Sequence, residues 1–407
     1  MSEKVVNAAL LGLGTVGTGV YKVIKSQEQE MTAKLGCQVK ITKILVRNLE
    51  KASGKVDDPS VLTTDWADIE GDPSIDIVIE LIGGVEPART YILAALKVGK
   101  NVVTANKDLI AVHGKEILET ARAAQKDFLF EAAVAGGIPI ISPLKNSLEA
   151  NHVTEVMGIV NGTTNFILTK MSQEGMEFSD ALALATELGY AEADPTADVE
   201  GYDACRKIAI LTSLVCGQQV DFEDIHTEGI TKITPTDIKY AQAMGRAIKL
   251  LATSKKGPKG YTAIVAPFLL PASHPLYAVN GVFNAIFVHG NVLGDAMFYG
   301  SGAGKLPTAS AVVADVVEMA KNLDKNIPIE WSSQKLELVD YKEWENRFFI
   351  RTTADKAAVE RVFGTVTYVQ AEGVTGELGF VTEKISEGDC EKKEAELGNI
   401  LQKIRVA

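Results

Sequence analysis

The sequence predicts an α/β protein that begins with a doubly wound parallel sheet and continues into mixed α+β structure. Two observations predict this fold class. Short apolar strands alternate with helical segments between residues 5 and 133, as in a parallel sheet covered by helices. The alternation then stops after a glycine-rich turn at 136–139. A chain of 407 residues is long enough for two or three domains.

The elements of the first part follow from their local patterns. Continuous apolar runs predict buried strands, at 5–11, 38–46, 75–81, 101–104 and 128–133. Helical spacing, with a proline in the first turn of one segment, predicts helices. The first expected helix follows the first strand and extends to about residue 25. The other two are expected at 87–98 and 108–125.

The second part mixes the two patterns. Its expected strands are 153–160, 261–268 and 284–289, and its expected helices are 163–173, 179–188, 203–216 and 235–251. A glycine-rich loop at 300–304 leads into a helix at 307–323, which we expect to return to the first part. The tail should contain strands at 347–352, 366–370 and 376–382 and helices at 356–363 and 389–403.

Composition excludes several classes of protein. The net charge of −12, with no basic run, argues against a nucleic-acid or anionic-membrane surface. Four cysteines without regular spacing are typical of reduced thiols in a cytoplasmic protein. The five histidines form no zinc motif, and neither a signal peptide nor a membrane-spanning stretch is expected.

The first strand ends in a glycine-rich loop with the spacing GxGxxG, formed by Gly12, Gly14 and Gly17. Such a loop permits a tight turn and the close approach of a pyrophosphate to a helix N-terminus, where Thr15 and Val16 also lie. The alternative is a turn needed only for packing. The context between a strand and a helix favours a Rossmann-type dinucleotide site.

The residues after the second strand bear on the choice of cofactor. Enzymes that use NAD usually place an acid there, whereas this chain has Arg47. An arginine suits a 2′-phosphate and favours NADP over NAD, unless Arg47 is an ordinary surface charge. Thr104 and Lys107 end another parallel strand at the edge where ligands bind, and Lys107 could also be a solvated loop lysine.

Two small-residue segments have two interpretations each. The turn at 131–139 could coordinate a monovalent cation through backbone carbonyls, but a simple hinge is favoured by the residues alone. The segment 161–165 (NGTTN) could use Thr163 or Thr164 to cap a helix, or could bind a small carboxylate ligand through backbone amides.

The most informative segment runs from Glu192 to Lys207 and contains five carboxylates followed by a lysine. Asp203 and Lys207 lie one helical turn apart, on the face that carries Ile210 and Leu214. A partly buried lysine with a carboxylate partner could act as a proton donor in a cleft. The alternative is an acidic surface loop and an ordinary i,i+4 ion pair.

Several of these motifs resemble homoserine dehydrogenase, and the resemblance covers nearly the whole chain. It is carried by GLGTVG at 12–17, TANK at 104–107, EAAVAGGIP at 131–139, NGTTN at 161–165, EADPTADVEGYDACRK at 192–207 and YGSGAGKLPTASAVVADV at 299–316. The resemblance implies reversible NAD(P)H-dependent reduction of L-aspartate 4-semialdehyde to L-homoserine by a homodimer. It implies a dinucleotide-binding domain at 1–134 with a return helix at 305–323, a catalytic and dimerisation domain at 135–304, a linker at 324–345 and an ACT-like regulatory domain at 346–407.

The resemblance also implies roles for individual residues. Lys207 would donate the proton to the aldehyde oxygen, and Asp203 would orient the side chain of Lys207. Lys107 would reach both substrate and cofactor. Glu192, Asp198 and Gly162 would bind substrate, and Gly302 would cover the dinucleotide. The sodium-binding positions of the family would be Glu131, Val134, Gly136 and Ile138.

The tail departs from the family pattern because no glycine follows Asp355 within its first turn, so threonine feedback is left open. An aspartokinase-like region is absent from the sequence, which predicts a monofunctional enzyme.

Two other functions compete with this interpretation. One is a related oxidoreductase acting on another small carbonyl compound, and the acidic segment argues against it because it suits an ammonium-bearing substrate. The other is a non-catalytic NADP sensor, which would not need the intact Asp203–Lys207 pair.

Overall fold

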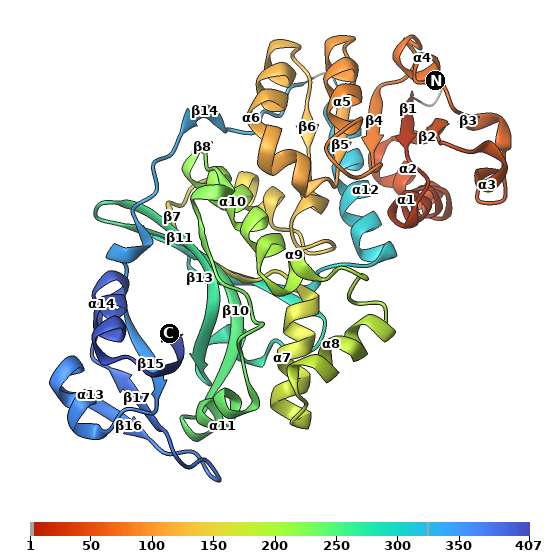
Figure 1. Cartoon of the computed structure of the whole chain (residues 1–407). Helices are drawn as coiled ribbons and strands as arrows, with labels where there is room; N and C mark the ends of the chain where they lie inside the picture. The colour runs from red at the N-terminus through yellow and green to blue at the C-terminus, as the bar shows by residue number, and fades with distance from the viewer. Residues whose placement is uncertain (1–3, 324) are drawn as a thin grey trace. The chain divides into compact units, whose positions relative to one another are not determined.

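The structure is a computed structural model that describes residues 4–323 and 325–407 (Figure 1). The chain divides into two compact units. Unit 1 comprises Met1–Ala150, Ile210–Asp221 and Gly300–Leu336, and unit 2 comprises Asn151–Ala209, Phe222–Tyr299 and Glu337–Ala407.

Unit 1 is built on a sheet whose strand order is β3-β2-β1-β4-β5-β6. The strands are β1 (Lys4–Leu11), β2 (Cys37–Leu45), β3 (Leu62–Thr63), β4 (Ile77–Glu80), β5 (Asn101–Thr104) and β6 (Phe128–Leu129). The pairings between neighbours are all parallel. The strand order reverses at β1 and β4, and ligands bind beyond the carboxyl ends of strands at such a point. The predicted doubly wound sheet is confirmed.

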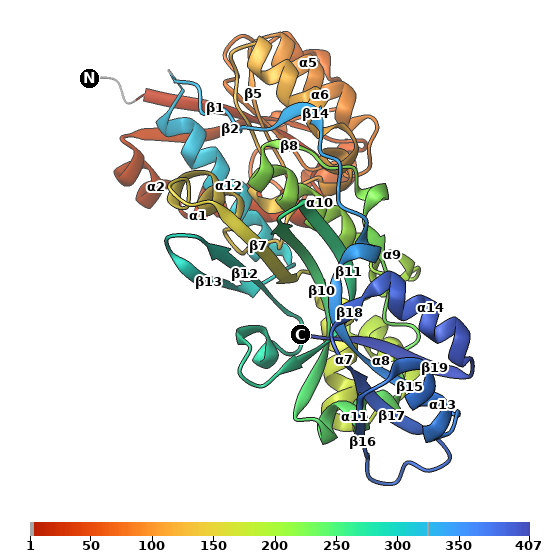
Figure 2. The same cartoon turned by 90° about the vertical axis from the view of Figure 1, so that its left-hand side faces the viewer.

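Helices cover both faces of this sheet, and Figure 2 shows α5 and α6 on the side opposite α1 and α12. The helices are α1 (Thr15–Ser26), α2 (Glu28–Leu35), α3 (Leu49–Ser53), α4 (Ala67–Glu70), α5 (Ala88–Lys97), α6 (Lys107–Ala123) and α12 (Lys305–Lys321). A Cβ on Gly19 of α1 would lie 2.7 Å from the carbonyl oxygen of Lys305. The helix predicted at 307–323 therefore packs directly against α1. A short pair of strands, β8 (Gln218–Gln219) and β14 (Ser332–Lys335), completes the unit.

Unit 2 is built on a long mixed sheet in which the order β13-β12-β7-β10-β11 precedes the strands of the tail. These strands are β7 (Val153–Ile159), β10 (Arg246–Gly257), β11 (Gly260–Pro271), β12 (Phe283–Gly290) and β13 (Gly294–Ser301), with β9 (His226–Thr227) beside β11. The helices are α7 (Gly162–Glu174), α8 (Phe178–Glu187), α9 (Thr196–Val199), α10 (Tyr202–Cys216) and α11 (Pro235–Ala243). The inner face of the sheet carries a buried apolar core that includes Ile159, Leu251, Ile264 and Phe268.

The tail has the order β-α-β-β-α-β, interrupted only by a short strand, β18 (Ile385–Ser386). Its elements are β15 (Glu345–Thr352), α13 (Lys356–Phe363), β16 (Val366–Val369), β17 (Leu378–Thr382), α14 (Glu387–Leu397) and β19 (Ile400–Val406). It has a core of its own, centred on Phe348 and Phe380. Strand β19 also pairs in parallel with β11, through Phe268 and Arg405, so the tail extends the sheet of unit 2.

Three predicted elements are wrong in part. The helix expected at 235–251 ends at Ala243, because Gly245 adopts a φ of 65° and the apolar run after it pairs as β10 with strands on both sides. The helix expected at 389–403 ends at Leu397, and Gly398 and Asn399 turn the chain into β19 with positive φ angles. The strand expected at 128–133 is limited to β6, and a 3-10 helix follows it at Glu131–Ala133. Short apolar runs do not distinguish strand from helix by periodicity alone.

Candidate functional site

The glycine loop of unit 1 has the geometry that a dinucleotide requires. Gly12 has a φ of 96°, and a Cβ there would lie 2.8 Å from the carbonyl oxygen of Leu81. A Cβ on Gly17 would collide with the carbonyl oxygen of Gly12 at 2.1 Å, whereas nothing lies within 4 Å of the Cβ position of Gly14. Gly14 is exposed and directly precedes α1, followed by the exposed Thr15 and the half-buried Val16. Two glycines are therefore needed for packing, and the third leaves room for a phosphate at the N-terminus of the helix.

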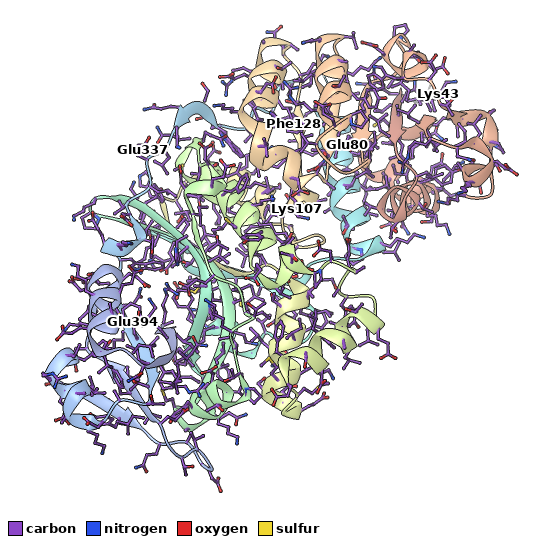
Figure 3. All side chains as sticks on the ribbon, in the orientation of Figure 1. Lys43, Glu80, Lys107, Phe128, Glu337 and Glu394 are labelled. Carbon is purple, nitrogen blue, oxygen red and sulfur yellow. The ribbon has the colours of Figure 1, made fainter. Side chains whose placement is uncertain are left out.

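A pocket of about 210 Å³ lies next to this loop, at the carboxyl ends of β4 and β5. Its lining consists of Val16, Glu80, Leu81, Gly83, Gly84, Ala105, Asn106, Lys107 and Asp108. Lys107 is the first residue of α6, and Asn106 caps that helix by accepting a hydrogen bond from the Leu109 amide at 3.1 Å. Figure 3 labels both Lys107 and Glu80 in this unit.

Glu80 is fully buried and connects the two loops of the pocket. One carboxylate oxygen accepts hydrogen bonds from the amides of Ile82 and Gly83, at 2.7 and 3.4 Å. The other accepts the Thr104 hydroxyl at 2.7 Å. Thr104 is itself fully buried, so its side chain supports the loop. The sequence does not single out Glu80, because a glutamate at the end of an apolar strand gives no sign of its distant partner.

The residues after β2 are consistent with a phosphate nearby. Arg47 is exposed, and Asn48 caps the short helix α3. Lys55, which the sequence did not single out, donates from Nζ to the carbonyl oxygen of Leu13 in the glycine loop at 2.9 Å. Three cationic residues, Arg47, Lys51 and Lys55, therefore lie on the segment that follows β2, and Lys55 contacts the glycine loop.

The turn at 131–139 is held firmly within unit 1. The Glu131 carboxylate accepts hydrogen bonds from the amides of Ile140, Ile141 and Ser142 at 2.6 to 2.8 Å, and the Glu131 amide donates to Asp315 at 2.8 Å. A Cβ on Gly136 would lie 2.4 Å from the carbonyl oxygen of Gly302. The loop that contains Gly302 therefore packs on this turn. Burial raises the pKa of both Glu131 and Asp315, the negative charge of Glu318 adds to both shifts, and Glu131 also raises the pKa of Asp315.

The candidate catalytic residues of unit 2 are the predicted ion pair on α10, Asp203 and Lys207. Lys207 Nζ donates to Asp203 Oδ2 at 2.7 Å and to the carbonyl oxygen of Val160 at 2.7 Å. The side chains of Lys207 and Asp203 are only 12% and 8% exposed. The predicted partly buried ion pair is confirmed. The Val160 carbonyl fixes the direction of the ammonium, because it accepts a second hydrogen bond just after the end of β7.

Asn161 joins this pair to a second carboxylate. Its Nδ2 donates to Asp203 Oδ2 at 2.9 Å and to Asp198 Oδ1 at 2.6 Å. Burial raises the pKa of Asp198, and the neighbouring Asp203 adds to the effect while the amide of Asn161 opposes it. Asn161 is also the cap of α7, since its Oδ1 accepts the Thr164 amide at 2.9 Å. The cap expected at Thr163 or Thr164 is therefore wrong, because the residue before the helix performs this role.

The structure brings together only some of the other predicted residues. Gly162 is the first residue of α7, and a Cβ there would lie 2.8 Å from the carbonyl oxygen of Val282. Glu192 is exposed in the loop between α8 and α9, and no hydrogen bond joins it to the carboxylates of Asp198 and Asp203 in the described residues.

Asn165, the last residue of the NGTTN segment, is joined to Lys249, which the sequence did not single out. Asn165 donates to the carbonyl oxygens of Val279, Gly281 and Phe283, and buried Lys249 donates to Asn165 and to the loop at 279–280. Burial lowers the pKa of Lys249 to about 8. Together the two side chains fix the loop that packs on Gly162.

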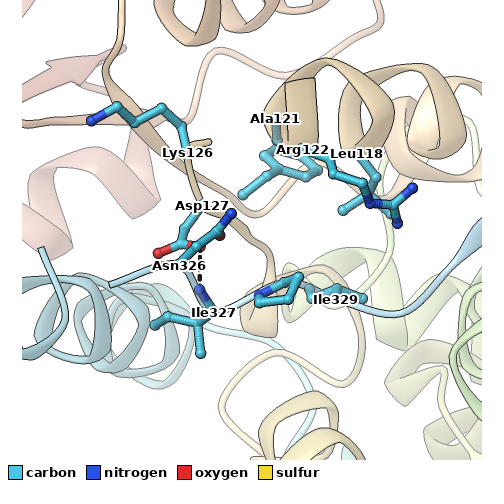
Figure 4. Close-up of a pocket in the computed structure, with 10 residues that line it drawn as sticks. Leu118, Ala121, Arg122, Lys126, Asp127, Asn326, Ile327 and Ile329 are labelled. Atoms are coloured by element: carbon cyan, nitrogen blue, oxygen red, sulfur yellow. Dashed lines mark hydrogen bonds between the residues drawn. The ribbon is translucent and has the colours of Figure 1, made fainter. Parts of the chain in front are cut away.

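A separate cavity beneath α6 has a volume of only about 20 Å³ (Figure 4). At its edge the Ile327 amide donates to Asp127 Oδ1 at 2.7 Å. A space of this size holds about one water molecule. It is too small for a substrate, and we assign no function to it.

Comparison with known proteins extends these observations. A family model described as homoserine dehydrogenase matches residues 139–317, and a model of the homoserine dehydrogenase NAD binding domain matches residues 12–131. The homoserine dehydrogenase of Bacillus subtilis is 49% identical over 321 residues, which cover 79% of this chain and 74% of that protein. The chain belongs to the homoserine dehydrogenase family.

Other homoserine dehydrogenases, compared by sequence or by structure, agree with this chain as well. The enzyme of Mycobacterium tuberculosis is 44% identical over 393 residues, covering 93% of this chain and 89% of that protein. The crystal structure of a homoserine dehydrogenase from Thiobacillus denitrificans has a TM-score of 0.92 and 37% identity, and the match covers 99% of this chain and 98% of that one. A hyperthermophilic archaeal homoserine dehydrogenase in complex with NADPH has a TM-score of 0.64 and 28% identity, over 77% of this chain and 97% of that one.

These comparisons confirm the family, the fold class and a nicotinamide-dinucleotide-binding domain. No helix among residues 4–323 and 325–407 is both long and apolar enough to cross a membrane.

Proposed function

We propose that this protein is a homoserine dehydrogenase, which reversibly reduces L-aspartate 4-semialdehyde to L-homoserine with NAD(P)H. The observation that carries the proposal is the buried Asp203–Lys207 pair, aimed by the Val160 carbonyl and joined by Asn161 to Asp198. Such an arrangement stabilises a developing alkoxide and supplies a proton to it.

Lys207 is the proposed proton donor. When the cofactor is bound, its nicotinamide ring supplies the hydride that reduces the aldehyde carbon. The carbonyl oxygen then becomes an alkoxide, and the Lys207 ammonium is the group that can protonate it. Asp203 and the Val160 carbonyl hold two of the three N–H bonds of the ammonium. The third makes no hydrogen bond to residues 4–323 and 325–407, and we propose that it is donated to the substrate oxygen.

The substrate ammonium needs anionic partners, and we assign this role to Asp198 and Glu192, with Asp203 as the shared member of the site. Asp198 is half-buried and held by Asn161, whereas Glu192 is exposed. Gly162, at the N-terminus of α7, offers a backbone amide to the substrate carboxylate. We assign to Lys107, at the first turn of α6, a contact with both substrate and cofactor.

The proposed cofactor contacts lie in unit 1. The residues at 12, 14–17 and 104 bind the dinucleotide through their backbone, and Gly302 covers it from the loop before α12. We favour NADP over NAD, because Arg47 is exposed after β2 where an acid would bind the ribose hydroxyls of NAD. The archaeal relative in complex with NADPH supports this preference.

We also propose a sodium ion at the turn that contains Glu131, Val134, Gly136 and Ile138. The Glu131 side chain is saturated by three amides, so the ligands would be backbone carbonyls, which suit a hard monovalent cation. Ala135 and Gly136 have positive φ angles of 56° and 54°, which make the backbone curve at this point. The ion would stiffen the turn on which the Gly302 loop packs.

Two assignments concern assembly and regulation. We infer a homodimer formed through unit 2, because its edge strand β13 exposes Met297 and Tyr299, at 43% and 55%. We infer that the tail is an ACT-like domain, and its β-α-β-β-α-β order supports this.

The test of the proposed function compares two aldehydes. NADPH oxidation at 340 nm is measured with L-aspartate 4-semialdehyde and with succinate semialdehyde, which lacks the amino group. We expect turnover of the first and a value of kcat/KM at least about 100-fold lower for the second, since the acidic site would lose its ammonium partner. Equal turnover of both would indicate a related oxidoreductase. No turnover of either, from folded protein that binds NADPH, would indicate a sensor.

A further inference from the structure

The end of the chain carries a buried cation. Arg405, in β19, is 1% exposed and makes two hydrogen bonds to Glu228, at 2.9 and 2.7 Å. It also binds both carboxylate oxygens of Glu387, at the start of α14. Removing a guanidinium and two carboxylates from water costs free energy, which only well-aligned hydrogen bonds between them offset. The three side chains therefore hold one another in place.

Glu228 lies beside further groups that hold it in place. His226 contacts the Glu228 carboxylate at 2.7 Å and stacks on Tyr341, whose hydroxyl donates to Glu391 of α14 at 3.0 Å. The Glu228 amide donates to the Val265 carbonyl at 2.7 Å. Burial alone would raise the pKa of Glu228, but His226 and Arg405 hold the pKa below its usual range.

The residues that follow Glu228 support the segment that leads into the catalytic helix. The Ile230 amide donates to the Val199 carbonyl at 2.8 Å. A Cβ on Gly229 would lie 2.1 Å from that same carbonyl oxygen, so the two backbones are in direct contact. Gly201, just before α10, has a φ of 83°, and its Cβ position is 3.3 Å from the Glu228 carbonyl oxygen.

We propose that Arg405 and Glu228 are positioning residues, which couple the C-terminal tail to the start of the helix that carries Asp203 and Lys207. The connection runs from Arg405 to Glu228, from the backbone at 229–230 to Val199, and then into α10. The tail therefore acts as a structural part of the catalytic site. This inference rests on the proposed function of Lys207.

The test uses a matched pair of substitutions in the full-length protein. Glu228→Gln removes the charge that binds Arg405, while Arg405 keeps Glu387 as a partner. The control is Glu377→Gln, because Arg351 binds Glu377 by two hydrogen bonds, at 2.7 and 2.8 Å, and keeps Asp237 as a second partner. Both changes remove one carboxylate from a buried arginine of the tail, but the contacts of Glu377 do not involve the segment at 196–203.

We expect Glu228→Gln to lower kcat for L-aspartate 4-semialdehyde at least about tenfold and to shift the pH profile of kcat, with the Kd for NADPH changed less than about twofold. Glu377→Gln should leave both the rate and the profile within about twofold of the wild type. Equal effects of the two variants, at a temperature where both are folded, would overturn the proposal. A wild-type protein without turnover would contradict the proposed function instead.

A second measurement keeps the inference testable if Glu228→Gln does not fold. Arg405→Lys retains the charge but loses the bidentate geometry, and Arg351→Lys is its control. Hydrogen exchange at the peptide covering 196–203 should be at least about fivefold faster in Arg405→Lys than in Arg351→Lys. Equal exchange at that peptide would contradict the coupling, whatever the activity of the protein.

Discussion

Replacing Lys207 by methionine tests the proposed proton donor, because methionine keeps most of the aliphatic stem and removes only the ammonium. The variant loses two hydrogen bonds of 2.7 Å, to Asp203 and to the Val160 carbonyl. A positioned general acid contributes about 10²- to 10⁴-fold to a rate, which corresponds to about 2.7–5.4 kcal/mol. We expect kcat to fall by that factor.

The effect should be confined to the chemical step. The Kd for NADPH, measured by fluorescence, should change less than about twofold, since the glycine loop belongs to the other unit. Lys170→Met is the matched control, because Lys170 forms an i,i+4 pair with Glu174 on the surface of α7, and we expect wild-type kinetics. A Lys207→Met enzyme that keeps kcat within about fivefold of the wild type would refute the assignment.

Three further predictions concern the cofactor and the pH dependence of stability. Arg47→Ala should raise the KM for NADPH about 10- to 100-fold and the KM for NADH less than about twofold; equal changes in steady-state assays would show that Arg47 does not bind the 2′-phosphate. Burial raises the pKa of Asp315, so its contribution to stability is lost as pH rises above the unfolded value of about 3.9. As the pH rises above about 4, the Tm of the wild type should therefore fall relative to the Tm of Asp315→Asn, and parallel Tm profiles would contradict this. Burial lowers the pKa of Lys249 to about 8. The free energy of unfolding of the wild type should then increase from pH 8 toward about pH 10.4. Urea titrations of Lys249→Met should show no such increase, and an equal increase in the variant would contradict this assignment.

Much of the site could be predicted from local sequence because its key residues interact over one helical turn or one loop. Asp203 and Lys207 are four residues apart on a helix, and their apolar neighbours on the same face predict burial. The glycine loop is likewise local, since the carbonyl oxygen of Gly12 leaves no space for a side chain at position 17. The family resemblance depends on these same segments.

The contacts of the supporting residues could not be predicted, because their partners are distant in the chain. Asn161 binds Asp198 and Asp203, which are 37 and 42 residues away, and Thr104 binds Glu80 across 24 residues. Arg405 and Glu228 are separated by 177 residues. Nothing in the sequence near these residues identifies their partners, and Glu80, Glu228 and Arg405 resemble ordinary polar positions.

The errors in the fold have a related cause. Residues 246–252 are apolar enough for a buried helix, and only pairing with β7 and β11 makes them a strand. The segment at 400–406 is similar, since its pairing with β11 and β15 decides its structure. In both places tertiary pairing outweighs local preference.

The proposed reduction of L-aspartate 4-semialdehyde by this chain is best tested by measuring the stoichiometry of its products. Purified protein is incubated with NADPH and the aldehyde, NADPH loss is followed at 340 nm, and homoserine is measured by mass spectrometry. We expect one molecule of homoserine to form for each NADPH oxidised. Folded protein that binds NADPH but forms no homoserine would contradict it.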